Sequence, residues 1–86
     1  AGMFKLKITS QAKSQLKQIS KKHHQLAISS ALDEIKENPF VGKPLSRELT
    51  GRFSYKVGVY RIIYIINKRD GIVNILFAGH RATVYD

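Results

Sequence analysis

The sequence of 86 residues contains no cysteine, and this absence excludes several kinds of chemistry. A disulfide, a thiolate nucleophile and a cysteine-based zinc site all require cysteine. Histidine is scarce as well: His23 and His24 are adjacent, whereas His80 lies far along the chain, so no metal-ligand spacing is present. We therefore expect neither a metal nor another cofactor.

Long apolar runs are also missing. No segment approaches the roughly 20 apolar residues that a membrane-spanning helix needs, and the N-terminus has no apolar signal-peptide segment. We expect a soluble, cytoplasmic protein without a membrane partner. Residues 1–86 are predicted to form one domain because of the length of the chain. Since 43% of the residues are hydrophobic, this domain should fold. Ala1 and Gly2 precede Met3 and are interpreted as an added remnant.

Acidic residues are few. Six Asp and Glu stand against 15 Lys and Arg, which gives a formal net charge of +9, spread over both halves of the chain. This charge favours a nucleic acid or an acidic protein as a partner, through long-range attraction and the release of counterions. For the lysines of the first half, the alternative is a surface that serves only solubility.

The first half of the chain predicts one strand and two helices. Apolar and basic residues alternate over Phe4–Ile8, which is typical of a half-buried strand. Apolar residues then recur at helical spacing after a cap at Thr9 or Ser10, and again as far as Glu37. Proline after Asn38 ends the second helix. His23 and His24 are assigned to a polar connection between the helices.

The second half predicts three strands. An irregular segment over 40–51 precedes strands expected at 52–57, 59–67 and 72–80, and the last two strands are joined by a turn that ends in Asp70 and Gly71. The order strand–helix–helix–strand–strand–strand predicts an α+β domain. In it, a helical hairpin packs on one face of a small, mainly antiparallel sheet.

Side-chain alternation predicts which residues share a face of the last two strands. Unless a bulge at Gly79 changes the count, one face contains Arg61, Ile63 and Ile65 of one strand, and one face of the other contains Val73, Ile75, Phe77 and Arg81. Both faces are largely apolar, and two helices cover only one. We therefore expect an exposed apolar patch rimmed by arginine, as at partner sites, unless the segment 40–51 covers it.

Two segments, from Val57 to Tyr64 and from His80 to Tyr85, resemble the RelE/ParE toxin superfamily. The resemblance extends over Met3–Asp86 and implies the RelE-like microbial RNase fold. RelE-like members are metal-independent endoribonucleases that cleave messenger RNA in the ribosomal A site, whereas ParE-like members inhibit DNA gyrase. Members of both branches are held inactive by a cognate antitoxin that wraps the toxin.

The resemblance also implies roles for three residues near the ends of the last two strands. Arg61 matches a strand arginine that contacts the scissile phosphate; the alternative is an ion pair with Glu48 or Asp86. Arg81 matches an arginine near the leaving oxygen, where charge stabilisation suits it because arginine stays protonated. Tyr85 matches a terminal tyrosine that stacks on a base or takes part in proton transfer, or else it fills the core.

Four further positions bear on the same site. Lys56 falls where RelE-like enzymes have a basic residue, which holds phosphate or acts as a base. The family pattern often has another basic residue two positions earlier, where this chain has Ser54, and Arg52 is the candidate to replace it. Some members use a histidine near His80 as the acid–base group, although alternation directs His80 away from Arg81.

The resemblance, with both arginines and Tyr85, predicts a toxin of a type II toxin–antitoxin system. It would be a ribosome-dependent, metal-independent mRNA endoribonuclease that inhibits translation. The expected partners are a cognate antitoxin, the ribosome and mRNA, with operator DNA bound only through the antitoxin complex. The first alternative is a ParE-like gyrase inhibitor without nuclease activity. The second is a binding module without catalysis.

Overall fold

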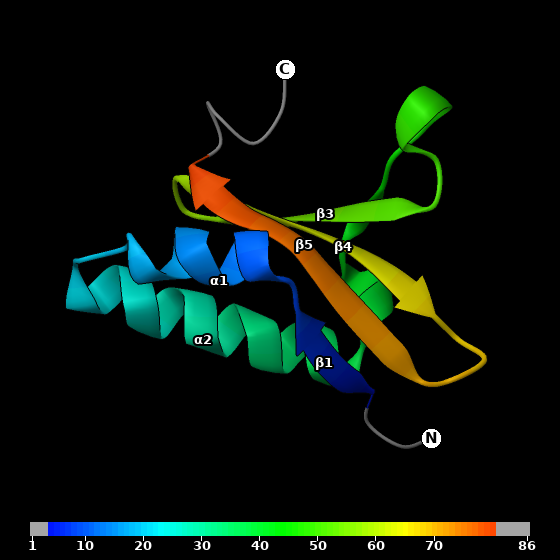
Figure 1. Ribbon diagram of the computed structural model, residues 1–86, viewed down its shortest axis with the longest axis horizontal. Helices are drawn as coiled ribbons and strands as arrows, with labels where there is room; N and C mark the ends of the chain where they lie inside the picture. Colours follow the sequence, from blue (N-terminus) through cyan, green and yellow to red (C-terminus); the bar gives the residue numbers. More distant parts are fainter. Residues whose placement is uncertain (1–3, 81–86) are drawn as a thin grey trace.

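A computed structural model describes residues 4–80 of the chain (Figure 1). In chain order the elements are β1 (Lys5–Ile8), α1 (Ser10–Lys17), α2 (Lys22–Glu37), the 3₁₀ turn η1 (Pro39–Val41), β2 (Lys43–Pro44), the 3₁₀ turn η2 (Arg47–Leu49), β3 (Arg52–Val57), β4 (Tyr60–Asn67) and β5 (Ile72–His80). The strands form one sheet in the order β1-β5-β4-β3-β2, in which only β1 and β5 pair in parallel. The two helices lie together against one face of the sheet (Figure 1). The predicted α+β fold is confirmed. Neither described helix has the length and apolar character of a transmembrane segment.

The start of α1 is fixed by Thr9, as the sequence predicts. Its side-chain oxygen accepts a hydrogen bond from the backbone N–H of Ala12 at 3.2 Å, and its hydroxyl donates to the carbonyl of Ile75 at 2.9 Å. The cap therefore satisfies a backbone donor at the helix terminus and also ties α1 to β5. Ala12, which follows, is completely buried against the sheet.

The structure corrects the position of the two adjacent histidines. His23 and His24 belong to the first turn of α2 rather than to the connection that precedes it. Lys21 occupies the N-cap position and makes no side-chain capping bond, so the sequence carries no capping signal there. The helix buries Ile28 and two other apolar side chains, and it ends before Asn38 as predicted.

Tyr64 fastens the irregular segment to the sheet. Its completely buried hydroxyl donates to the carbonyl of Pro39 at 2.6 Å and accepts from the N–H of Gly42 at 3.0 Å. Burial raises the pKa of Tyr64 to about 12. A side chain on Gly42 would collide with the Tyr64 hydroxyl, so this close approach requires glycine. The segment that follows contains β2, a short strand that the sequence did not predict.

A bulge changes the alternation predicted for β5. Ile63 pairs with Phe77 and Tyr64 pairs with Ile75, so Leu76 is the extra residue. The bulge lies here and not at Gly79. As a result, the prediction that Phe77 shares a face with Val73 and Ile75 is wrong. Three buried β5 residues instead belong to the core cluster beneath the helices: Val73, Ile75 and Ala78.

The exposed apolar patch predicted for the opposite face is not found at the centre of the described part of that face. Ile63, which lies at its centre, is only 3% exposed. Val41 and Leu45, from the segment predicted to be irregular, lie beside Ser54 on this face. The segment 40–51 therefore extends the sheet beside β3 through β2 and lines this part of the face.

Candidate functional site

A pocket with a volume of about 400 Å³ lies where β2, β3 and β4 meet. Its walls come from elements that are distant in the sequence, and three of its side chains are cations. We call it the cationic pocket. The residues that line it are Val41, Lys43, Leu45, Ser54, Tyr55, Lys56 and Arg61.

Strand register brings the cations together. Lys56 lies directly opposite Arg61 in the β3–β4 pair, and Lys43 lies opposite Ser54 in the β2–β3 pair. Directly opposed residues project from the same face of a sheet, with Cβ atoms about 4.5–5.5 Å apart. On β3, Ser54 and Lys56 are two residues apart and so share that face. All three cations therefore project from the face opposite the helices.

The electrostatic character of the cationic pocket follows from this arrangement. Among its described lining residues, none is acidic. Arg61 is half-buried and its Nε atom is shielded from solvent, whereas Lys43 and Lys56 are exposed. A charge that is partly removed from water interacts more strongly with a ligand charge than one in bulk solvent. The pocket is thus suited to an anion, and charge-assisted hydrogen bonds from arginine and lysine match the oxygens of a phosphodiester.

The site residues predicted from the sequence differ in where the structure places them relative to the pocket. Arg61 and Lys56 meet in the cationic pocket. Arg52 shares their face but is not part of the lining, and its carbonyl accepts a hydrogen bond from the N–H of Leu45 at 2.9 Å. The backbone of Arg52 thus helps to hold the segment that precedes it. Arg81 and Tyr85 lie outside the described residues.

His80 lies on the other side of the sheet from the cationic pocket. It pairs with Tyr60 across β4 and β5, and the two rings are in edge contact with centroids 6.2 Å apart. Tyr60 in turn contacts His24, whose Nδ1 atom lies 3.0 Å from the tyrosine hydroxyl oxygen. Desolvation, followed by the charges of His23 and Lys21, lowers the pKa of His24. The predicted direction of His80 was relative to Arg81, which lies outside the described residues.

Lys43 is the cation of the pocket that the sequence did not indicate. It lies in the segment predicted to be irregular, and a strand of two residues is too short to show alternation. Its place in the pocket depends on the pairing of β2 with β3, which brings together residues that are 11 positions apart. In the sequence, Lys43 is recognisable only as a basic residue between Gly42 and Pro44, which does not predict its place in a pocket.

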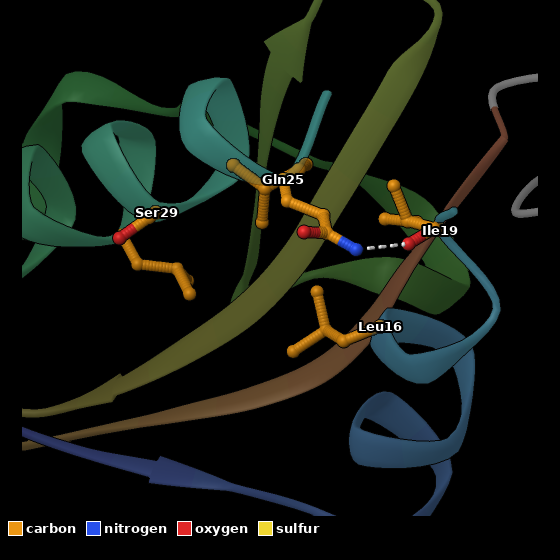
Figure 2. A pocket seen from close by; sticks show the side chains of 6 residues that line it. Leu16, Ile19, Gln25 and Ser29 are labelled. Atoms are coloured by element: carbon orange, nitrogen blue, oxygen red, sulfur yellow. Dashed lines mark hydrogen bonds between the residues drawn. The ribbon is translucent and has the colours of Figure 1, made fainter. Parts of the chain in front are cut away.

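A second, apolar hollow lies between the two helices (Figure 2). It has a volume of about 210 Å³, and one end is crossed by a hydrogen bond of 2.7 Å from the Gln25 side chain to the carbonyl of Ile19 (Figure 2). Leu26, which follows Gln25 on α2, is 61% exposed. We call this surface the helical groove. The residues that line it are Leu16, Ile19, Gln25, Ile28, Ser29 and Leu32.

Comparisons with known proteins agree in the kind of protein they find. Residues 6–85 match the family described as the ParE toxin of type II toxin–antitoxin systems, parDE. Toxin RelG of Mycobacterium tuberculosis is 34% identical over 83 residues, which cover 95% of each chain. A solved chain of the toxin–antitoxin complex RelBE2 from M. tuberculosis superposes with a TM-score of 0.82 at 32% identity, covering 93% of this chain and 100% of that chain.

A more distant likeness supports the fold alone. A chain of the archaeal RelE–RelB complex from Pyrococcus horikoshii OT3 has a TM-score of 0.77 at 24% identity, over 96% of this chain and 100% of that chain. All of these similarities extend over almost the full chain. They include the elements that form both the cationic pocket and the helical groove.

Proposed function

The chain belongs to the ParE toxin family, within the RelE/ParE superfamily of type II toxins, and we propose that it is a ribosome-dependent, metal-independent mRNA endoribonuclease. Its relation to RelE-like and RelG toxins supports this activity. The observation that carries the proposal is the cationic pocket, in which Arg61 and Lys56 project side by side without an acidic residue among the described lining.

The proposed chemistry is the attack of the RNA 2′-oxygen on the neighbouring phosphorus, with cleavage of the bond to the 5′-oxygen. Negative charge accumulates on the phosphate oxygens during this step, and fixed cations at that point usually supply the largest catalytic contribution. The half-buried guanidinium of Arg61 is the better fixed of the two cations, so we assign it to the scissile phosphate. Lys56 holds the same phosphate or accepts the proton of the 2′-hydroxyl.

Two residues complete the proposed site on the strength of the family resemblance. Arg81 is proposed to stabilise charge at the departing oxygen, and Tyr85 to stack on a base or to transfer a proton. We assign no part in this pocket to His80, because it projects from the opposite face. The reaction is proposed to take place in the cytoplasm on ribosome-bound mRNA.

A cognate antitoxin is the proposed protein partner, in line with the toxin–antitoxin complexes among the structural neighbours. We propose that its apolar side chains cover the helical groove, whose neighbour Leu26 is exposed. The described residues around the connection between the two helices are basic rather than acidic and favour an acidic partner; they include Lys17, Lys21 and Lys22. Operator DNA would be bound only through the complex with this antitoxin.

Inhibition of DNA gyrase is the second candidate function. One observation favours it, namely that the matching family is described as the ParE toxin. A gyrase inhibitor does not need cations converging on a phosphate, so the two functions differ in their dependence on Arg61.

The test compares the purified wild-type toxin with Arg61→Ala in a translating extract. Arg69→Ala is the matched control, because it removes the same charge from the exposed turn between β4 and β5. We expect mRNA cuts in phase with codons for wild type and control, and a rate lower by about 100-fold or more for Arg61→Ala. Loss of cleavage in Arg81→Ala is expected as well. Intact mRNA together with inhibited gyrase supercoiling would support the ParE-like function instead.

A further inference from the structure

We propose that Lys43 supplies the phosphate-binding cation that the RelE-like pattern often has at position 54, where this chain has serine. This inference rests on the proposed nuclease function. Ser54 is 7% exposed and lies between Lys43 on β2 and Ile63 on β4 in the sheet register. Its short neutral side chain leaves the floor of the cationic pocket without a charge at that point, and Lys43 is the next residue across the sheet.

The backbone at Lys43 is held on both sides. One residue before it, the N–H of Gly42 donates to the buried hydroxyl of Tyr64 at 3.0 Å. Two residues after it, the N–H of Leu45 donates to the carbonyl of Arg52 at 2.9 Å. Pro44 also restricts the backbone, because its ring fixes the φ angle. A lysine in an unattached loop would have no defined direction, whereas this one starts from a fixed strand position.

The side chain of Lys43 itself is exposed and lines the same pocket as Lys56 and Arg61. A flexible ammonium group at the rim of a pocket suits it to bind an RNA phosphate as a point charge. We therefore assign Lys43 to binding of the backbone at or next to the scissile phosphate. Proton transfer is not part of this assignment.

The position of the cation in space, and not its place in the sequence, should then decide activity. Lys43→Gln removes the charge while keeping a long polar side chain, and Lys43→Arg retains the charge. Lys13→Gln is the matched control, since Lys13 is an exposed lysine on α1, on the helical side of the sheet. The relocated variant Lys43→Gln/Ser54→Lys moves the ammonium across the β2–β3 pair to the family position.

The experiment measures mRNA cleavage rates on purified ribosomes at several salt concentrations, with the melting temperature as a check of folding. We expect Lys43→Gln to cleave about 10-fold more slowly than wild type and to show a salt dependence weaker by about one charge. Lys43→Arg and Lys13→Gln should behave like wild type. The relocated variant should regain most of the rate if its melting temperature shows that it folds.

The outcomes separate this inference from the proposed function. If wild type cleaves and Lys43→Gln matches Lys13→Gln in rate and salt dependence, Lys43 does not bind the phosphate, whatever the relocated variant does. If Lys43→Arg is as slow as Lys43→Gln, the charge is not what matters and the inference also fails. A wild type that leaves mRNA intact would overturn the nuclease proposal, and the role of Lys43 would fall with it.

Discussion

The hydroxyl of Tyr64 holds a neighbouring segment in place, although Tyr64 lies in the middle of an apolar strand. It satisfies the carbonyl of Pro39 and the N–H of Gly42, and both of these groups precede the residue whose cation we assign to phosphate binding. Buried polar groups lose free energy when they are left without a partner. This oxygen atom is therefore one of the groups that hold the segment on the sheet, together with the pairing of β2 with β3.

Replacing Tyr64 with Phe should lower the free energy of unfolding by about 1–3 kcal/mol, because two buried backbone groups lose their partner. Urea unfolding monitored by circular dichroism measures this change. Tyr55→Phe is the control: its hydroxyl bonds to Glu34 at an exposed position and should matter less. A Tyr64→Phe protein as stable as wild type would show that the Tyr64 hydroxyl does not hold the segment.

The raised pKa of Tyr64 predicts how the free energy of unfolding depends on pH. The pKa of Tyr64 is raised from 10.0 to about 12 in the folded state, so between these values the unfolded chain has lost the proton that the folded chain retains. Fewer bound protons in the unfolded state mean that stability falls as pH rises. The fall should begin near pH 10, and its Tyr64 component should be missing in Tyr64→Phe.

Among the helices and strands, the long elements could be predicted from local sequence signals, whereas the short ones could not. Thr9 caps α1, Asn38 ends α2, and two apolar runs separated by a turn give β4 and β5. In contrast, β2 has two residues, and its existence depends on pairing with β3. The start of α2 was not predicted correctly, because Lys21 makes no capping bond. The bulge at Leu76 could not be predicted, because the residues on either side of it are apolar.

The candidate site shows the same division. Arg61 and Lys56 were found because the family resemblance covers the strands that contain them. Arg52 was the expected substitute for a missing cation, whereas the structure brings Lys43 into the pocket and leaves Arg52 outside its lining. Distance along the chain favoured Arg52, but the register across β2 and β3 decides which residue lies beside Ser54.

Gly42→Ala tests whether β2 positions the site as an element. The added methyl group would collide with the Tyr64 hydroxyl, and relief of such overpacking typically costs about 1–3 kcal/mol and shifts the backbone. We expect a lower melting temperature and a loss of mRNA cleavage even under conditions where the protein stays folded. Ser46→Ala is the control, since Ser46 is exposed and makes no capping bond. Full cleavage by folded Gly42→Ala would show that the position of β2 is not important for the site.

At the scale of the whole molecule, the proposed binding sites for RNA and for the antitoxin lie on opposite sides of the sheet. The cationic pocket is on the face away from the helices, and the helical groove lies between the two helices (Figure 2). Between them lies the core formed by β4, β5 and both helices. Binding of an antitoxin and cleavage of RNA should therefore respond to different substitutions, provided that each substituted side chain is exposed enough to leave the core intact.

Leu26→Asp and Lys56→Ala form the pair that tests this separation. Both side chains are exposed, so neither substitution should unfold the protein. Leu26→Asp introduces a charge beside the helical groove and should weaken antitoxin binding by about 10-fold or more, measured by calorimetry, while mRNA cleavage stays unchanged. Lys56→Ala should lower cleavage and retain the antitoxin affinity, because the charge it removes lies across the sheet. Equal losses of both activities in both variants would mean that antitoxin and RNA compete for one surface, and the assignment of the helical groove to the antitoxin would then be wrong.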